Sequence, residues 1–360
     1  MKRCVAVALA TAFFGALVAG PAAAAPNDPH FARQWHFAKV QAEQAWGTTT
    51  GTGVLVAVVD SGVDLTHPDL QANIVSYNDA DMVEPDGNCT GPAQSRVCTQ
   101  DGAQDENGHG THVAGLIGAV ANNGVGVAGV APGAKILPVR SLNENGDGTT
   151  EQVAAGIRFA AQKGADVINL SLGIDARGHA VNLVGLLDPI HDAIAFAWAQ
   201  GATIVIAAGN ESTPLCAEPS ANPTVVCVGA LDQFDNVAWY SNTDASHQNY
   251  VVAPGGWSLG ALSLGSASPT GATCQGEIFS TYLRSQQSWC SAEAGYEGIS
   301  GSSMSTPIVS GVAALLASRG YTNQEIVACL KTSATDIGPP GRDPFYGHGR
   351  VNALAAVTTC

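Results

Sequence analysis

The sequence predicts an α/β fold with a doubly wound, mostly parallel β-sheet that carries helices on both faces. Short apolar runs rich in β-branched residues recur along the chain, with helix-like segments between them. Parallel strands that are buried on both faces have this continuous apolar character, and the segments between them then form the crossover helices. The expected strands span residues 54–60, 135–140, 166–173, 203–210 and 224–231.

Helical periodicity marks the segments between these runs, at 109–121, 151–164 and 188–201. The last two end at Gly164 and Gly201, as helices commonly do. In doubly wound sheets, ligands bind at the carboxyl ends of the strands. Asp60 and Asn210 each end a predicted strand, so we expect both near a functional site.

The polar stretches 78–107 and 255–298 interrupt this pattern, and each contains two cysteines. We expect both to be surface loops held by a disulfide. No internal repeat or interdomain linker divides the chain, so residues 26–360 are expected to form one domain.

Residues 1–25 have the features of a secretory signal peptide. Lys2 and Arg3 precede an apolar run from Val5 to Val18, and small residues follow at 20–25. The alternative, a membrane anchor, is disfavoured because the run is shorter than the roughly 20 residues that span a bilayer. The sequence therefore predicts a secreted protein, in extracellular or periplasmic transit, without a membrane anchor.

The composition is that of a compact globular protein, with 46% hydrophobic and 12% charged residues. The net charge is −15, with 15 Lys and Arg against 30 Asp and Glu. Because no basic stripe is available for a phosphate backbone, we expect no nucleic-acid partner. The acidity favours solubility and could attract cations. We expect a monomer.

The chain has nine cysteines, of which Cys4 lies in the predicted signal peptide. An even number in an exported protein indicates disulfides, and C-x-x-C zinc spacing is missing from the sequence. The order of the cysteines suggests four local pairs: Cys89 with Cys98, Cys216 with Cys227, Cys274 with Cys290, and Cys329 with Cys360.

Four short motifs contain residues suited to nucleophilic catalysis: VAVVDSGVD around Asp60, ENGHGTHVAG around His109, AAGNES around Asn210, and GSSMSTP at 301–307. Each could be structural if taken alone: a strand-end turn, a helix start, or a Gly-Ser linker. A serine hydroxyl is a weak nucleophile unless a base, a group that orients the base and an oxyanion donor accompany it. Together, the four motifs supply all of these.

These motifs together resemble the subtilases, the subtilisin-like serine proteases, over residues from about 27 to 357. The resemblance implies a subtilisin-like fold and proteolysis of protein or peptide substrates. By position in the motif, Ser303 is the implied nucleophile rather than Ser302 or Ser305. His109 is then the general base, and Asp60 orients it. The side chain of Asn210 and the backbone N–H of Ser303 would stabilise the oxyanion.

The resemblance also implies how substrate binds. An extended peptide would add as a strand between two segments, Ser171-Leu172-Gly173 and Gly146-Asp147-Gly148. The pocket for the residue before the cut would be walled by 171–173 and by Ala207, Ala208 and Gly209. We expect broad specificity with large apolar residues in that pocket, although Glu218 near its base would favour a basic residue.

Structural Ca²⁺ is the expected cofactor. The loop at 120–132 matches a calcium-binding loop of the family, and hard oxygen ligands of this kind suit the ion. The implied ligands are Asp28, Asp69, the carbonyl oxygen of Val120, Asn123, and the carbonyl oxygens of Val125 and Val127. The alternative is a Gly-rich loop without an ion. The acidic stretch 78–87 could also ligate a cation, but such runs are more often only solvated.

One feature departs from the family. Most secreted subtilases carry a propeptide, whereas a mature-like amino terminus here follows the signal almost immediately, so no built-in propeptide is expected. The sequence disfavours two other classes of protein. A catalytically silent binding module would usually lack a triad member. A metallopeptidase would show H-E-x-x-H, which is absent, and an α/β-hydrolase esterase would carry its nucleophile in G-x-S-x-G, a pattern that does not contain Ser303.

Overall fold

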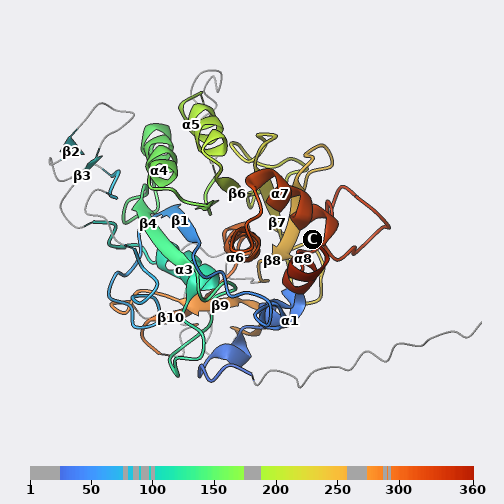
Figure 1. Ribbon diagram of the computed structural model, residues 1–360, viewed down its shortest axis with the longest axis horizontal. Coiled ribbons are helices and arrows are strands. Elements are labelled where there is room, and N and C mark those ends of the chain that lie inside the picture. The colour runs from blue at the N-terminus through green and yellow to red at the C-terminus, as the bar shows by residue number, and fades with distance from the viewer. Residues whose placement is uncertain are drawn as a thin grey trace, which may run out of the picture.

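The central sheet has six strands, all parallel, in the order β4-β1-β5-β6-β7-β8 (Figure 1). The computed structural model describes residues 25–75, 80–83, 89–90, 97–98, 102–173, 188–257, 274–286, 290 and 293–360. The strands are β4 (Lys135–Arg140), β1 (Leu55–Asp60), β5 (Val167–Leu170), β6 (Thr203–Ala207), β7 (Val226–Leu231) and β8 (Tyr250–Pro254). The predicted parallel sheet is therefore confirmed, with β8 as an additional strand.

Helices cover both faces of the sheet because the side chains of each strand alternate between two apolar cores. Along β1, Val56 and Val58 belong to one core, whereas Ala57 and Val59 belong to the other. The helices α3 (His109–Gly118) and α6 (Ser302–Ala317) pack on the first face. The helices α4 (Thr150–Gln162) and α5 (Asp188–Ala199) lie side by side on the second face (Figure 1). This arrangement confirms the doubly wound α/β class.

Local sequence signals explain the ends of α4 and α5. A reciprocal capping box between Thr149 and Gln152 begins α4. Gly164 and Gly201 follow the two helices with φ angles of 77° and 97°, a backbone conformation that favours glycine. Both predicted glycine stops are thus present.

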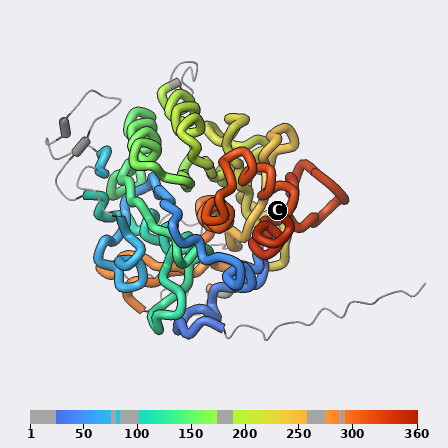
Figure 2. The backbone as a smooth tube through the Cα atoms, viewed as in Figure 1, coloured from blue at the N-terminus to red at the C-terminus, as the bar shows by residue number. Residues whose placement is uncertain are grey.

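Short elements complete the fold around the sheet. The helix α2, near the amino-terminal end, contacts the carboxy-terminal helix α8 (Figure 2). These elements are η1 (Phe31–Arg33), α1 (His36–Val40), α2 (Ala42–Ala45), β2 (Cys89–Thr90), β3 (Val97–Cys98), η3 (Cys274–Gly276), β9 (Ile278–Thr281), β10 (Tyr296–Ile299), α7 (Asn323–Thr332) and α8 (Ala353–Thr359).

The prediction that 255–298 is only a surface loop is wrong for its later part. The strands β9 and β10 form an antiparallel pair, and β9 packs against α3. Ile278 and Phe279 are buried there. Because this pair is short and embedded in Gly- and Ser-rich sequence, its apolar signal is weak in the sequence. The signal peptide and the stretch 84–88 lie outside the described residues.

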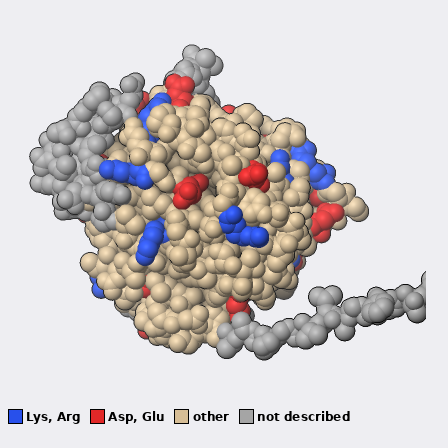
Figure 3. All heavy atoms as spheres, in the orientation of Figure 1, with Lys and Arg blue, Asp and Glu red and all other residues tan. Residues whose placement is uncertain are grey.

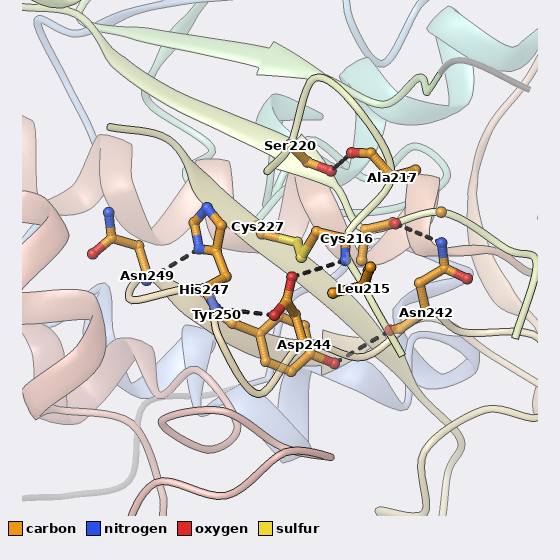
Figure 4. Close-up of a disulfide and its surroundings, with 12 residues drawn as sticks. Leu215, Cys216, Ala217, Ser220, Cys227, Asn242, Asp244, His247, Asn249 and Tyr250 are labelled. Atoms are coloured by element: carbon orange, nitrogen blue, oxygen red, sulfur yellow. Dashed lines mark hydrogen bonds between the residues drawn. A yellow bond between two sulfur atoms is a disulfide. The ribbon is translucent and has the colours of Figure 1, made fainter. Parts of the chain in front are cut away.

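Three of the four predicted disulfides are confirmed: Cys216–Cys227, Cys274–Cys290 and Cys329–Cys360. Cys89 and Cys98 are directly opposed across the β2–β3 pair, but their side chains lie outside the description, so this pair stays a prediction. Figure 4 shows how Cys216–Cys227 ties the loop after β6 to β7. The carboxylate of Asp244 accepts a hydrogen bond of 3.0 Å from the Cys216 N–H in the same region.

The surface in view is sparsely charged. Lys and Arg side chains are scattered singly among uncharged residues on this face, with Asp and Glu between them (Figure 3). Across the described residues, no helix is both long enough and apolar enough to cross a bilayer.

Candidate active site

Asp60 and His109 meet at the carboxyl end of β1. The His109 Nδ1 lies 2.8 Å from Asp60 Oδ1 and 3.0 Å from Oδ2. Asp60 is fully buried, and the backbone N–H of Ser61 donates to its Oδ1 at 2.7 Å. A buried carboxylate is costly without such partners. Because Asp60 occupies the Nδ1 side of the imidazole, Nε2 is the nitrogen left to exchange a proton with a reacting group.

A close backbone approach brings His109 to Asp60. His109 is the first residue of α3, and Gly110 follows it. A Cβ at Gly110 would overlap the carbonyl oxygen of Gly62 and lie 3.2 Å from the Asp60 Cβ. Only glycine lets the first turn of α3 approach the end of β1 this closely.

Of the three serines in 302–305, only Ser303 is partly exposed. Ser302 and Ser305 are fully buried, and their hydroxyl groups are engaged within the fold. The Ser302 hydroxyl accepts from the Gly209 N–H at 3.2 Å, and the Ser305 hydroxyl donates to the Ala253 carbonyl at 3.0 Å. Accessibility therefore favours Ser303 as the reactive serine, in agreement with its motif position.

Pro307 and Ser171 fix the backbone of Ser303. In a regular helix, the N–H of residue 307 would bond to the carbonyl of Ser303, but proline has no N–H. The hydroxyl of Ser171 donates to the Ser303 carbonyl instead, at 2.8 Å. That hydroxyl in turn accepts from Asn169 Nδ2 at 2.9 Å. The end of β5 therefore holds the start of α6.

Asn210 is anchored beside the same helix start. Its Oδ1 accepts from the Ser302 N–H at 2.9 Å, which leaves the Nδ2 of the amide as a donor for another group. The buried side chain of Asn242 holds the surrounding backbone. Its Nδ2 donates to the Ala208 carbonyl at 2.9 Å and its Oδ1 accepts from the Glu211 N–H at 3.0 Å. This rigid support suits a preorganised oxyanion donor.

Two histidines of α3 have opposite electrostatic environments. Burial lowers the pKa of His109, but the carboxylates of Asp60 and Asp105 raise it, and the net result is a raised pKa. Burial and the nearby His109 instead lower the pKa of His112 to about 3. His112 Nε2 lies 3.1 Å from the Ile278 carbonyl. His112 is thus a neutral core residue, and His109 is the imidazole able to take up a proton.

A cavity of about 570 Å³ opens beside His109. It brings together the two segments predicted to bind substrate, 146–148 and 171–173. Its other lining residues are three apolar and four polar residues: Leu142, Val153, Ile190, Asn107, Asn145, Thr149 and Thr150. Ser171 connects this cavity with Ser303, because it lines the cavity and holds the Ser303 carbonyl.

The segment 207–209 lies across from 173 with Ala217 between them. A Cβ added to Gly209 would lie 3.1 Å from the Ala217 Cβ, and one added to Gly173 would lie 3.9 Å from it. Glu211 contacts Asn242 at 2.7 Å beside Gly209. Glu218, the residue considered for a basic preference, lies 3.5 Å from His191 Nε2.

The expected calcium ligands surround two buried carboxylates. Asp69 accepts from Asn123 Nδ2 and the Val127 N–H, each at 2.8 Å, and the Val125 N–H donates to Asn123 Oδ1 at 2.7 Å. The Val120 N–H bonds to the Asp69 carbonyl. Asp28 accepts from the N–H groups of residues 122 and 123. Burial raises the pKa of Asp69 to about 7, and the charge of Asp28 contributes.

This donor set fits a hard divalent cation, because a buried carboxylate beside a second carboxylate gains from a positive charge. Within the described residues, no group of three or more His, Cys, Asp or Glu side chains is arranged to hold a metal. The expected site needs only two such side chains, since its other ligands are an amide and backbone carbonyls.

Comparison with known proteins identifies the family. The sequence profile of the subtilase family matches residues 51–349. The chain belongs to the subtilase family. It is 38% identical over 333 residues to thermitase of Thermoactinomyces vulgaris, covering 92% of this chain and 99% of that protein. It is 34% identical to subtilisin Savinase of Lederbergia lenta, covering 89% and 97% of the two chains.

A solved structure gives the same result for the fold. A protease from Pseudoalteromonas arctica PAMC 21717 superposes with a TM-score of 0.75 at 33% identity, covering 93% of this chain and 99% of that one. This protein is therefore a serine-type endopeptidase of the subtilisin type.

Sequence reasoning missed several residues that build the site. Asn242 and Asp105 contact the motif residues from neighbouring loops, and Leu142, Val153 and Ile190 line the cavity. Asp105 had a visible signal, since it is an acidic residue immediately before the His109 motif. Nothing local in the sequence distinguishes Asn242 from other loop asparagines.

Proposed function

We propose that this subtilase cleaves peptide bonds with Ser303 as nucleophile, His109 as general base and Asp60 as the group that orients the base. The observation that carries the proposal is the contact of buried Asp60 with His109 Nδ1. Ser303 would attack the carbonyl while His109 Nε2 accepts its proton, forming an acyl-enzyme and releasing the amine that the same imidazole protonates. Water then hydrolyses the ester by the same route.

The oxyanion would be stabilised by two donors at the start of α6. Asn210 Nδ2 is free to donate because its Oδ1 already accepts from Ser302. The N–H of Ser303 lies in the first turn of a sixteen-residue helix, where the dipole favours negative charge. Both donors are held before substrate arrives, which is the condition for strong oxyanion stabilisation.

We propose an extended peptide substrate between 146–148 and 171–173. The cavity beside His109 supports this, because both segments line it together with the apolar residues Leu142, Val153 and Ile190. We propose broad specificity with a large apolar residue before the cut, because the walls at 171–173, 207–209 and Ala217 are small residues apart from the apolar Leu172. A basic preference through Glu218 is less favoured, since that carboxylate is close to His191.

We also propose that the protein binds a structural calcium ion and is exported. Structural Ca²⁺ would be held by Asp28 and Asp69 together with Asn123 and the carbonyl oxygens of Val120, Val125 and Val127. The raised pKa of Asp69 supports a cation at this position. We further propose that residues 1–25 direct export and that 26–360 form a single peptidase domain.

Hydrolysis of a peptide substrate by three variants tests the proposal. Ser303→Ala should lower kcat by about 10⁶-fold because it removes the nucleophile. Asn210→Ala should fold and lose roughly 10²- to 10³-fold. Ser305→Ala is the matched control, since its hydroxyl bonds only to the Ala253 carbonyl, and it should keep the wild-type rate. Wild-type turnover by Ser303→Ala would contradict the proposal.

A further inference from the structure

Asp105 is a buried carboxylate that the proposed chemistry does not use. It lies in the loop before α3, and only 3% of its surface is exposed. A carboxylate in such a place is costly unless its oxygens are hydrogen-bonded. The donors that satisfy Asp105 lie on both sides of His109 along the chain.

Its two oxygens accept five hydrogen bonds. Oδ1 accepts from the N–H groups of Asn107 and Gly108 and from the Ser61 hydroxyl, each at 2.9 Å. Oδ2 accepts from the Thr111 N–H at 2.9 Å and from its hydroxyl at 2.6 Å. An ionised carboxylate has two acceptor oxygens for these donors, whereas the amide of an asparagine in its place would have only one. Asp105 therefore binds the loop before His109 and the first turn of α3 after it.

Ser61 connects this wrapping to Asp60. Its hydroxyl donates to Asp105 and accepts from the Gly110 N–H at 3.0 Å, while its own N–H donates to Asp60 Oδ1. One hydrogen-bonded path thus joins the end of β1 to the start of α3. These are the two elements whose relative position sets the distance from Asp60 to His109.

We propose that Asp105 is a positioning residue for His109, which holds the imidazole against Asp60 and adds a second negative charge that stabilises the imidazolium. The proposal rests on the proposed function of His109 as the general base. Positioning matters because a misplacement of about 1 Å can cost on the order of 10²-fold in rate.

The titratable groups around His109 determine how activity should depend on pH. Asp60 faces it from β1 and Asp105 from the preceding loop, and both raise its pKa. His112 on α3 is neutral because burial lowers its pKa to about 3. Tyr282, whose hydroxyl contacts the Asn107 carbonyl, has a raised pKa through burial and is also neutral. Glu106 is paired with Arg140 at 2.6 Å.

Removing the charge of Asp105 should therefore lower the pKa of His109. The imidazole would then stay unprotonated to a lower pH, so the acid limb of the profile of kcat/KM against pH should move to lower pH. A residue with only a structural role would reduce stability without moving this limb.

The test uses three variants, with activity expressed per active site by fluorophosphonate titration. Asp105→Asn should lower kcat/KM on the plateau by roughly 10- to 100-fold and move the acid limb downward. Ser61→Ala removes the connecting hydroxyl but keeps the charge, so it should lower the plateau and leave the limb in place. Asp343→Asn alters another buried carboxylate that accepts loop N–H groups, and should leave both unchanged.

A titration of the His109 imidazole by NMR, in the Ser303→Ala chain with and without Asp105→Asn, separates this proposal from the proposed function. The midpoint should fall in the Asp105→Asn chain even if neither protein hydrolyses peptides. An unchanged midpoint together with wild-type kcat/KM would overturn the proposal. If Asp105→Asn does not fold, the Ser61→Ala plateau decides: wild-type kcat/KM there would also overturn it.

Discussion

Two pairs of buried carboxylates lie near the two ends of helix α3: Asp60 and Asp105 near its amino terminus, and Asp28 and Asp69 near its carboxy terminus. The two pairs have different hydrogen-bond partners. At the amino-terminal end, Asp60 and Asp105 accept from helix-start N–H groups, hydroxyls and an imidazole that can carry a positive charge. Beyond the carboxy-terminal end, Asp69 accepts only from neutral groups, namely the Asn123 amide, the Val127 N–H and, at 3.4 Å, the Tyr296 hydroxyl.

The position of the first pair at the amino terminus of α3 contributes to this difference in partners. A helix amino terminus presents free N–H groups and a positive partial charge, so anions there are stabilised by the protein. Near the other end, burial and the charge of Asp28 raise the pKa of Asp69. The first pair therefore has its hydrogen-bond donors and a protonatable imidazole within the protein, whereas the second pair would gain from a bound cation.

Chelation should lower the stability of the wild type. Removing Ca²⁺ from the wild type should lower the free energy of unfolding by about 2.7 kcal/mol when the starting concentration is a hundredfold above Kd. Thermal unfolding with and without chelator measures this. Asp69→Asn should unfold at a lower temperature and lose the chelator response, while Asp105→Asn should retain the response. A wild-type Tm that is the same with and without chelator would contradict this difference between the two carboxylate pairs.

The pH dependence of stability tests the second pair in the absence of the ion. The folded pKa of Asp69 is raised to about 7, so the folded state binds a proton that the unfolded state releases at lower pH. Without calcium, stability should thus decline as pH rises from the unfolded pKa of Asp toward about 7. Bound calcium should suppress this decline because it binds the ionised form.

Denaturant titrations at several pH values, with and without chelator, measure this decline. Asp69→Asn is the matched control and should lack the component that belongs to Asp69. If the calcium-free wild type and Asp69→Asn showed the same dependence of stability on pH, the pKa of Asp69 would not be raised in the folded state.

The sequence predicted the sheet well because its strands are buried apolar runs that end in recognisable polar residues. Five of the six strands, the helices α3, α4 and α5, and the three motifs around Asp60, His109 and Ser303 were legible for this reason. The short strands β9 and β10 were missed because Gly and Ser surround them.

The supporting residues of the site were much less predictable. Asp105 and Asn242 act through hydrogen bonds to backbone groups brought close only by the fold, such as the contact of Asn242 with the Ala208 carbonyl. Likewise, Ser171 was expected to form a substrate wall, but its hydroxyl also replaces the hydrogen bond that Pro307 cannot donate to Ser303. A one-dimensional pattern does not contain such contacts.

The most direct test of the central claim is the pH dependence of fluorophosphonate labelling, with the labelled residue identified by peptide mapping. We predict that the label is found on Ser303 and that its rate rises as His109 loses its proton, with a midpoint above the usual histidine value. His109→Ala should abolish this dependence and label far more slowly. Labelling of another serine, or an equal rate in His109→Ala, would contradict the claim.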